Sequence, residues 1–113
     1  MEQGLELSNF SLLRASASKA CLLLKVLANE DRFLILCQLT EGELNVGEIE
    51  EMLGILQPTL SQQLGVLRDE GFVKTRREGK YIYYSLASFE VIEVMKTLSS
   101  LYCAKARKAT HKH

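Results

Sequence analysis

The spacing of the apolar residues in this chain changes at Gly71, from a helical period to an alternating one. Before Gly71, the residues Leu60, Leu64 and Leu67 recur at intervals of four and three, which is typical of one buried helix face. After it, "FVKTRREGKYIYYSL" alternates apolar and polar residues, and Gly79 lies where a tight hairpin turn favours glycine. The chain is therefore expected to join a helix directly to a two-stranded ribbon.

A second short helix is predicted immediately before the first. Asn45 is a suitable N-cap, and Glu48 follows it at the spacing of a capping box. Gly54 ends this helix, and Pro58 suits the first position of the next one. The apolar stripe of the shorter helix is expected to consist of Ile49, Met52 and Leu53. The two helices are therefore predicted to form a helix-turn-helix over about residues 46–70, followed by the ribbon over about residues 72–86.

The remaining helices are predicted on either side of this unit. The segment "LSNFSLLRASASKACLLLKVLA" is expected to form a short helix near Ser8 to Arg14 and a longer one from about Ala15 to Leu27. Asn29 caps the helix "EDRFLILCQL", whose acidic first turn suits the helix dipole. The segment "EGELN" is expected to be a loop. A last helix, capped by Ser88, is expected over about residues 88–106.

The size and composition of the chain fit one domain with a single core, since 47% of its 113 residues are hydrophobic. The predicted fold is mainly α with a small β-hairpin, a winged helix-turn-helix in the order α-α-α-α-β-β-α that occupies residues 1–113.

No apolar segment reaches the roughly 20 residues of a membrane span, and no secretory signal is recognisable. Three cysteines are too few for a disulfide scaffold. We therefore expect a cytoplasmic protein with no membrane partner and with reduced thiols at rest.

The helix before Gly71 carries no carboxylate between Gln57 and Arg68, although the chain contains 14 acidic residues. Amides and hydroxyls suit a helix in the DNA major groove, because base edges offer donors and acceptors while phosphates repel carboxylates. The charge of the chain also favours nucleic acid: residues 1–54 contain four basic and nine acidic residues, and residues 55–113 contain ten and five. The candidate recognition residues are Gln57, Thr59, Ser61, Gln62 and Gln63.

The hairpin places basic side chains beside this helix, where they would contact phosphates or enter the minor groove. The candidate wing residues are Arg76, Arg77, Lys80 and Tyr81. An alternative interpretation is a solvated polar helix followed by a solvated charge cluster, with the strand tyrosines serving ordinary packing. The helix alone favours neither interpretation, and the adjacent basic hairpin favours DNA binding.

Three stretches carry a resemblance to a known family: "LANEDRFLILCQL", "VGEIEEMLGILQPTLSQQLGVLRDEGFVKTRREGKYIYYSL" and the closing helix. Together they resemble the ArsR/SmtB family of dimeric winged-helix repressors over nearly the whole chain. The resemblance implies a homodimer joined by helices at about residues 15–28 and 88–106. It also implies operator DNA as partner, an imperfect palindrome on which two recognition helices meet major grooves about 34 Å apart.

Many members of that family sense metals, and two of their site patterns can be compared with this chain. The first places thiols before the helix-turn-helix, where this chain has Asn45 and Gly47 in "ELNVGEI". The second uses carboxylates and histidines on the last helix, where this chain has Glu90 and Glu93 but no histidine. A closed zinc site needs about four ligands. Neither standard site is intact, and no metal or cofactor is expected.

Two cysteines suggest a different effector. The placement of Cys37 and Cys103 is similar to that in the persulfide-sensing, two-cysteine members of the family. The resemblance implies that these residues form a redox sensor, bridged by a disulfide or a short polysulfide when reactive sulfur species or oxidants are present. It further implies control of sulfide-detoxification genes. From the residues alone, Cys37 within "FLILCQL" is more simply a buried apolar side chain, and packing is also the default role of Cys21.

Other functions remain open. A metal-responsive repressor could use the nonstandard ligands Cys37, Cys103 and His111, and a winged-helix module could bind a protein instead of DNA. An enzyme is not expected, because both histidines, His111 and His113, lie in the basic tail, away from a Ser or Cys nucleophile held by the fold.

Overall fold

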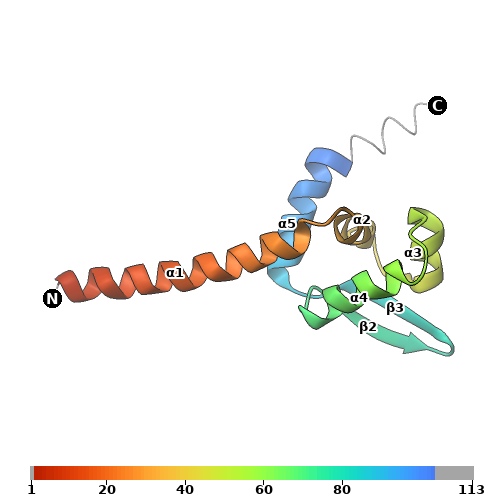
Figure 1. Ribbon diagram of the computed structural model, residues 1–113, viewed down its shortest axis with the longest axis horizontal. Coiled ribbons are helices and arrows are strands. Elements are labelled where there is room, and N and C mark those ends of the chain that lie inside the picture. The colour runs from red at the N-terminus through yellow and green to blue at the C-terminus, as the bar shows by residue number, and fades with distance from the viewer. Residues whose placement is uncertain (1, 104–113) are drawn as a thin grey trace.

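The computed structural model describes residues 2–103, with side chains for residues 9–103. One long helix, α1 (Glu2–Leu27), projects from the molecule, and the other elements gather around its C-terminal end (Figure 1). These elements are, in chain order, α2 (Glu30–Leu39), β1 (Leu44–Asn45), α3 (Val46–Leu53), α4 (Thr59–Asp69), β2 (Val73–Glu78), β3 (Tyr81–Leu86), α5 (Phe89–Leu98) and the π-helical turn η1 (Ser99–Cys103). The fold is mainly helical with a hairpin wing, as predicted.

The first helix is longer than expected. The sequence predicts two helices, near Ser8 to Arg14 and Ala15 to Leu27, whereas α1 is continuous over 26 residues. Residues 5–27 contain neither glycine nor proline, so no residue interrupts the backbone hydrogen bonds of the helix. The irregular apolar spacing that suggested a break instead reflects a helix whose N-terminal part lies outside the core (Figure 1). The expected last helix differs too: α5 ends at Leu98, η1 continues to Cys103, and residues 104–106 lie outside the described residues.

The helix-turn-helix forms as predicted, with small corrections. Asn45 Oδ1 accepts a hydrogen bond from the Glu48 amide at 2.8 Å, and Glu48 Oε1 accepts one from the Asn45 amide at 2.9 Å. This reciprocal pair is a capping box, which starts α3. Pro58 occupies the cap position before α4, so the helix begins one residue later than expected, at Thr59.

The sheet has three strands where the sequence predicts two. β1, the last two residues of the expected loop "EGELN", pairs with β3, so that the strand order is β1-β3-β2. β2 and β3 pair antiparallel from Val73 opposite Leu86 to Glu78 opposite Tyr81, and Gly79 takes the positive φ of 61° that the turn requires. A two-residue strand leaves no alternation to recognise in a sequence. β1 forms because β3 offers it a free edge.

The core lies between the helices and one face of this sheet. Leu60, Leu64 and Leu67 are buried, which confirms the predicted inner face of α4. The α3 prediction is partly wrong: Ile49 is fully buried, but the Met52 side chain is 57% exposed. The largest fully buried side chains are Ile35, Leu36, Ile49, Leu60, Leu67 and Met95. Throughout residues 2–103, every helix is too short or too polar to cross a lipid bilayer.

The burial difference along α3 gives a test of the core. Replacing the fully buried Ile49 with Ala is expected to lower the free energy of unfolding by about 2–5 kcal/mol, because the methyl groups it removes leave a cavity. The matched variant Met52→Ala, on the same helix but exposed, is expected to change it by less than about 0.5 kcal/mol. Urea unfolding followed by circular dichroism measures both. Equal losses would contradict the packing of α3.

Candidate DNA-binding surface and cysteine pair

The outer face of α4 is polar and carries no carboxylate in its first turn. Because the three leucines of the helix face the core, Thr59, Ser61 and Gln62 are left on the exposed side. Gln57, in the turn before the helix, is also exposed, and its Oε1 accepts hydrogen bonds from the amide of Ser61 at 3.1 Å and from the Ser61 hydroxyl. Gln57 therefore caps the first turn of α4, a role that Pro58 cannot fill.

Gln63 differs from the other candidate recognition residues, because it is half-buried and bonded to another helix. Its Oε1 accepts a hydrogen bond from Arg32 Nη1, on α2, at 2.9 Å. The same guanidinium donates from Nε to the backbone oxygen of Val26, in the last turn of α1, at 2.7 Å. Arg32 thus joins three helices. The sequence analysis missed this residue, and no local pattern around it indicates a partner 31 positions away.

The wing carries the basic residues that the sequence predicts, but Arg76 is already paired. Its guanidinium donates to both carboxylate oxygens of Glu43 at 2.8 Å and to Glu78 at 2.9 Å, and it lies 4.5 Å from the centroid of the Tyr83 ring. The hydrogen bonds to Glu43 and Glu78 raise the pKa of Arg76 above its ordinary value. The guanidinium therefore keeps its charge, while two carboxylates compensate it. Glu43 is a second residue that the sequence analysis missed.

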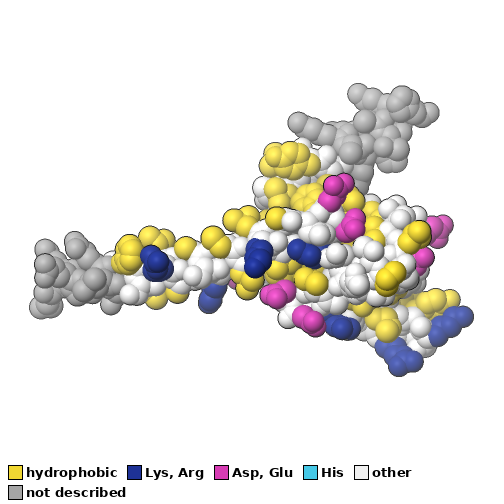
Figure 2. Space-filling view, viewed as in Figure 1, with side chains coloured by type: hydrophobic (Ala, Val, Ile, Leu, Met, Phe, Trp, Pro, Cys, Tyr) yellow, Lys and Arg dark blue, Asp and Glu magenta, His cyan; other side chains and the backbone are white. Residues whose placement is uncertain are grey.

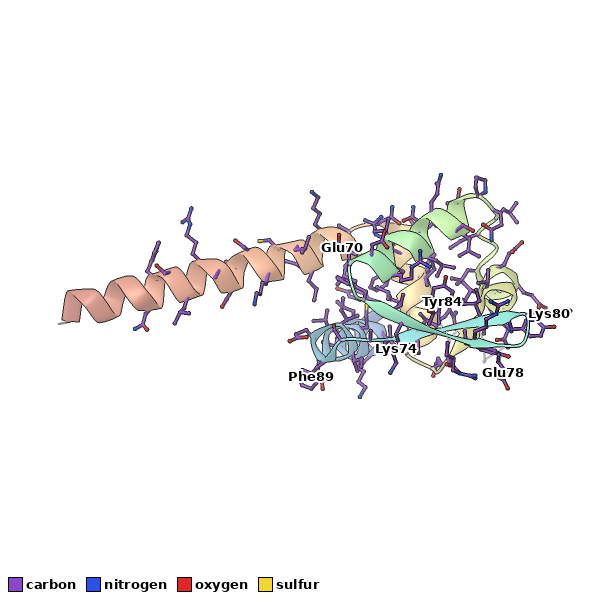
Figure 3. The ribbon with its side chains drawn as sticks, turned by 90° about the horizontal axis from the view of Figure 1, so that it is seen from below. Glu70, Lys74, Glu78, Lys80, Tyr84 and Phe89 are labelled. Carbon is purple, nitrogen blue, oxygen red and sulfur yellow. The ribbon has the colours of Figure 1, made fainter. Side chains whose placement is uncertain are left out.

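The other basic wing residues lie around the hairpin turn. Arg77 Nε donates to the Gly79 backbone oxygen at 3.1 Å, and Lys80 Nζ lies 5.4 Å from the centroid of the exposed Tyr81 ring. Figure 2 shows Lys and Arg side chains gathered at the tip of the wing, where Figure 3 labels Lys80 beside Glu78. The wing tip therefore presents positive charge to solvent at the end of the sheet far from α5 (Figure 1).

The structure brings together two cysteines that are far apart in the sequence. The side chain of Cys37, on α2, is only 3% exposed, and its Sγ lies 2.7 Å from Sγ of Cys103, the last residue of η1. Neither residue is in a disulfide. A disulfide requires about 2.05 Å between the sulfur atoms, so a small movement of η1 or α2 suffices to form one. Cys21 is exposed on α1 and is not part of this pair.

The residues that could hold a metal do not cluster within the described part of the chain. Across that part, no three side chains of His, Cys, Asp or Glu gather closely enough to ligate an ion. Cys37 and Cys103 would supply two sulfur ligands, and His111, the third nonstandard ligand considered from the sequence, lies outside the described residues.

Comparisons with known proteins identify the family and the fold of the chain. The sequence profile of the family described as "Bacterial regulatory protein, arsR family" matches residues 29–75. The biofilm growth-associated repressor of Agrobacterium fabrum is 43% identical over 106 residues, which cover 92% of this chain and 91% of that protein. The crystal structure of the transcriptional repressor BigR from Xylella fastidiosa superposes with a TM-score of 0.79 at 43% identity, over 84% of this chain and 94% of that one.

A further structure bears on assembly. The homodimeric winged helix-turn-helix DNA-binding domain of Mb0332 from Mycobacterium bovis matches with a TM-score of 0.66 at 32% identity, over 78% of this chain and 82% of that one. Identity above 40% over nine-tenths of both chains, with the same fold, establishes kinship. The chain belongs to the arsR family of bacterial regulatory proteins, a family of helix-turn-helix transcription regulators rather than of enzymes.

Proposed function

We propose that this protein is a homodimeric, DNA-binding transcriptional repressor whose affinity for its operator falls when Cys37 and Cys103 become bridged. The observation that supports the proposal is the 2.7 Å distance between Sγ of Cys37 and Sγ of Cys103. Cys37 lies on α2, and Cys103 lies at the end of η1, which directly follows α5. The names of the Agrobacterium and Xylella relatives, both repressors, support the direction of control. The regulated genes would be those of sulfide detoxification.

The DNA-binding surface consists of α4 and the wing. An amide- and hydroxyl-bearing face without carboxylates suits base edges in the major groove, and a basic hairpin tip suits phosphates. The residues proposed for contact are Gln57, Thr59, Ser61 and Gln62 on the helix side and Arg76, Arg77, Lys80 and Tyr81 on the wing, whereas the remaining candidate, Gln63, is bonded to Arg32. The operator is an imperfect palindrome, because two identical helices of a dimer contact half-sites about 34 Å apart.

The dimer contact is proposed on α1 and α5, within about residues 15–28 and 88–106, of which 104–106 lie outside the described residues. Large hydrophobic side chains are exposed along α1 (Figure 2), and monomeric proteins rarely leave such a row uncovered. These side chains include Phe10, Leu12, Leu13, Leu22 and Leu24. A mostly apolar groove of about 740 Å³ lies between α1, the end of α4 and the start of α5, next to this row.

The switch follows from the positions of the two thiols. Bridging them fixes η1 to α2, and α2 in turn contacts α4 through Arg32 and Gln63. Because α5 and η1 belong to the proposed dimer contact, a shift there changes the angle between the two halves and the spacing of the recognition helices. A tenfold loss of affinity requires about 1.4 kcal/mol, within the usual range of allosteric coupling.

The chemistry needs an external oxidant, for which an organic persulfide suffices. The two thiols lose two protons and two electrons as one S–S bond forms, and the persulfide is cleaved to a thiol and hydrogen sulfide. A second persulfide would insert one further sulfur atom, giving a trisulfide bridge and releasing another thiol. A peroxide would give the direct disulfide and be reduced to water. Each route joins the same two positions, so each is expected to release DNA.

The thiol pair is tested by replacing either member with Ser. Cys37→Ser and Cys103→Ser are expected to bind operator DNA when reduced but to keep it after persulfide or peroxide, because no bridge can form. Cys21→Ser, outside the pair, is expected to release DNA as the wild type does. Electrophoretic mobility shifts with intact mass measurement provide the readout. Persulfide-triggered release by either pair variant, or release of the wild type by zinc alone, would contradict the redox assignment and favour a metal sensor.

The wing is tested through the salt dependence of binding. Lys80→Gln is expected to weaken binding to operator and non-specific DNA alike. It should reduce the slope of log affinity against log salt by about 1.8, because each of the two protomers loses one phosphate contact. Lys96→Gln, at an exposed position on α5 outside the proposed DNA surface, serves as the control once analytical ultracentrifugation has shown that this variant stays dimeric. It should leave that slope unchanged. An unaltered slope for Lys80→Gln, measured by fluorescence anisotropy across salt concentrations, would remove this residue from the interface.

Dimer formation is tested on the exposed row of α1. Leu24→Glu is expected to shift the protein to monomers, because a carboxylate would enter an apolar contact, while the fold of each chain survives since Leu24 is 59% exposed. Met52→Glu, at an exposed position on α3, serves as the matched control and should remain dimeric. Analytical ultracentrifugation distinguishes the two species. A dimeric Leu24→Glu variant would place the contact elsewhere.

A further inference from the structure

The guanidinium of Arg32 lies at the junction of α1, α2 and α4. It bonds Val26 in the last turn of α1 at 2.7 Å and Gln63 on α4 at 2.9 Å, while its own backbone amide is held by the cap residue Asn29 at 3.0 Å. The side chain of Arg32 thus fixes the end of α1 and the middle of α4, and its backbone amide takes part in the cap at the start of α2. The planar fork of Arg suits this arrangement, because its donors point in set directions that Lys cannot reproduce.

Each of the two side-chain bonds satisfies a specific need. The last carbonyls of a helix have no partner within it, and a positive charge there is favoured by the helix dipole. Arg32 supplies both a hydrogen-bond donor and a positive charge to the end of α1, through its bond to the Val26 backbone oxygen. Nη1 of the same guanidinium donates to the half-buried Gln63. The rotation of α4 about its own axis is therefore coupled to the position of the end of α1. Packing of the apolar side chains alone would not fix that rotation as narrowly.

The bond also changes what Gln63 can do on DNA. A glutamine recognises adenine by using its oxygen and its nitrogen together. The oxygen of Gln63 already accepts from Arg32, so the amide is directed toward α2 and only one lone pair of that oxygen remains. Its neighbour Gln62 is exposed on the outer face of α4. Two adjacent glutamines of the same helix are therefore suited to different tasks.

We infer that Arg32 is the positioning residue of the recognition helix and that Gln63 is its acceptor rather than a base-contacting side chain. The inference rests on the proposed DNA binding and deepens it, because it names the contact that holds α4 in register. It also connects the thiols to the DNA surface. Cys37 lies on the same helix as Arg32, so a displacement of α2 by a Cys37–Cys103 bridge moves the guanidinium that holds Gln63.

Paired substitutions of the two glutamines separate the roles. Gln63→Glu is expected to keep operator affinity within about threefold of wild type, because its carboxylate accepts from Arg32 in a charge-assisted hydrogen bond. Gln62→Glu is expected to lose at least about tenfold, because its carboxylate faces DNA phosphates. Arg32→Gln is expected to lose about tenfold with an unchanged salt slope, since a positioning contact and no phosphate contact is lost. Fluorescence anisotropy with operator DNA, using the reduced full-length protein, measures all three.

Thermal unfolding of the same variants examines the contact without DNA. Gln63→Glu is expected to raise the unfolding midpoint, Arg32→Gln to lower it, and Gln62→Glu to leave it unchanged. A loss of operator affinity in Gln63→Glu as large as that in Gln62→Glu would overturn the inference, as would a reduced salt slope in Arg32→Gln. Wild-type protein that binds no operator would overturn the proposed function instead, and the unfolding midpoints would still decide whether Arg32 holds Gln63.

Discussion

Burial of Ile35, Leu36, Cys37 and Leu39 on α2 is the constraint on which the rest of this structure depends. Ile35 and Leu36 are adjacent in sequence and point to different sides of the helix, yet both are fully buried. Because successive buried residues of a helix point in different directions, this part of α2 must be covered by several elements, and α1, α3, α4 and β3 contact the helix. Its position decides where the helix-turn-helix lies relative to the long N-terminal helix. A local change in α2 is therefore transmitted to several elements at once.

The same helix carries the groups that link the proposed functions. Its first turn contributes Arg32, bonded to α1 and α4, and its last turns contribute Cys37, beside Cys103 of η1. Side chains on one short helix move together, because the helix behaves as a rigid body over ten residues. Bridging of the thiol near the end of α2 can thus be coupled to the position of α4, which the start of α2 holds, without a long chain of intermediate residues.

The charged residues of the proposed DNA-binding surface are of two kinds, those without a carboxylate partner and those that carboxylates compensate. The outer face of α4 has no carboxylate in its first turn, whereas Arg76 on the wing is held by Glu43 and Glu78 and stacked on Tyr83. Bidentate bonding to a carboxylate fixes a guanidinium in direction as well as in charge. Arg76 thereby joins the loop before β1 to β2 and stiffens the base of the wing, while Lys80 remains at its tip (Figure 3).

The sequence by itself determined the elements whose signals are local: the leucine face of α4, the capping box of α3, the glycine of the hairpin turn and the helical order. These depend on spacing within a few residues, and the structure confirms them. The family resemblance also selected Cys37 and Cys103, although neither residue has a local signal of reactivity. Only the tertiary structure decided that their sulfur atoms meet, that Arg32 reaches Gln63, that Glu43 holds Arg76 and that β1 pairs with β3. The physical reason is that each of these contacts joins residues more than 30 positions apart, and their approach is set by how buried helices pack rather than by any short pattern.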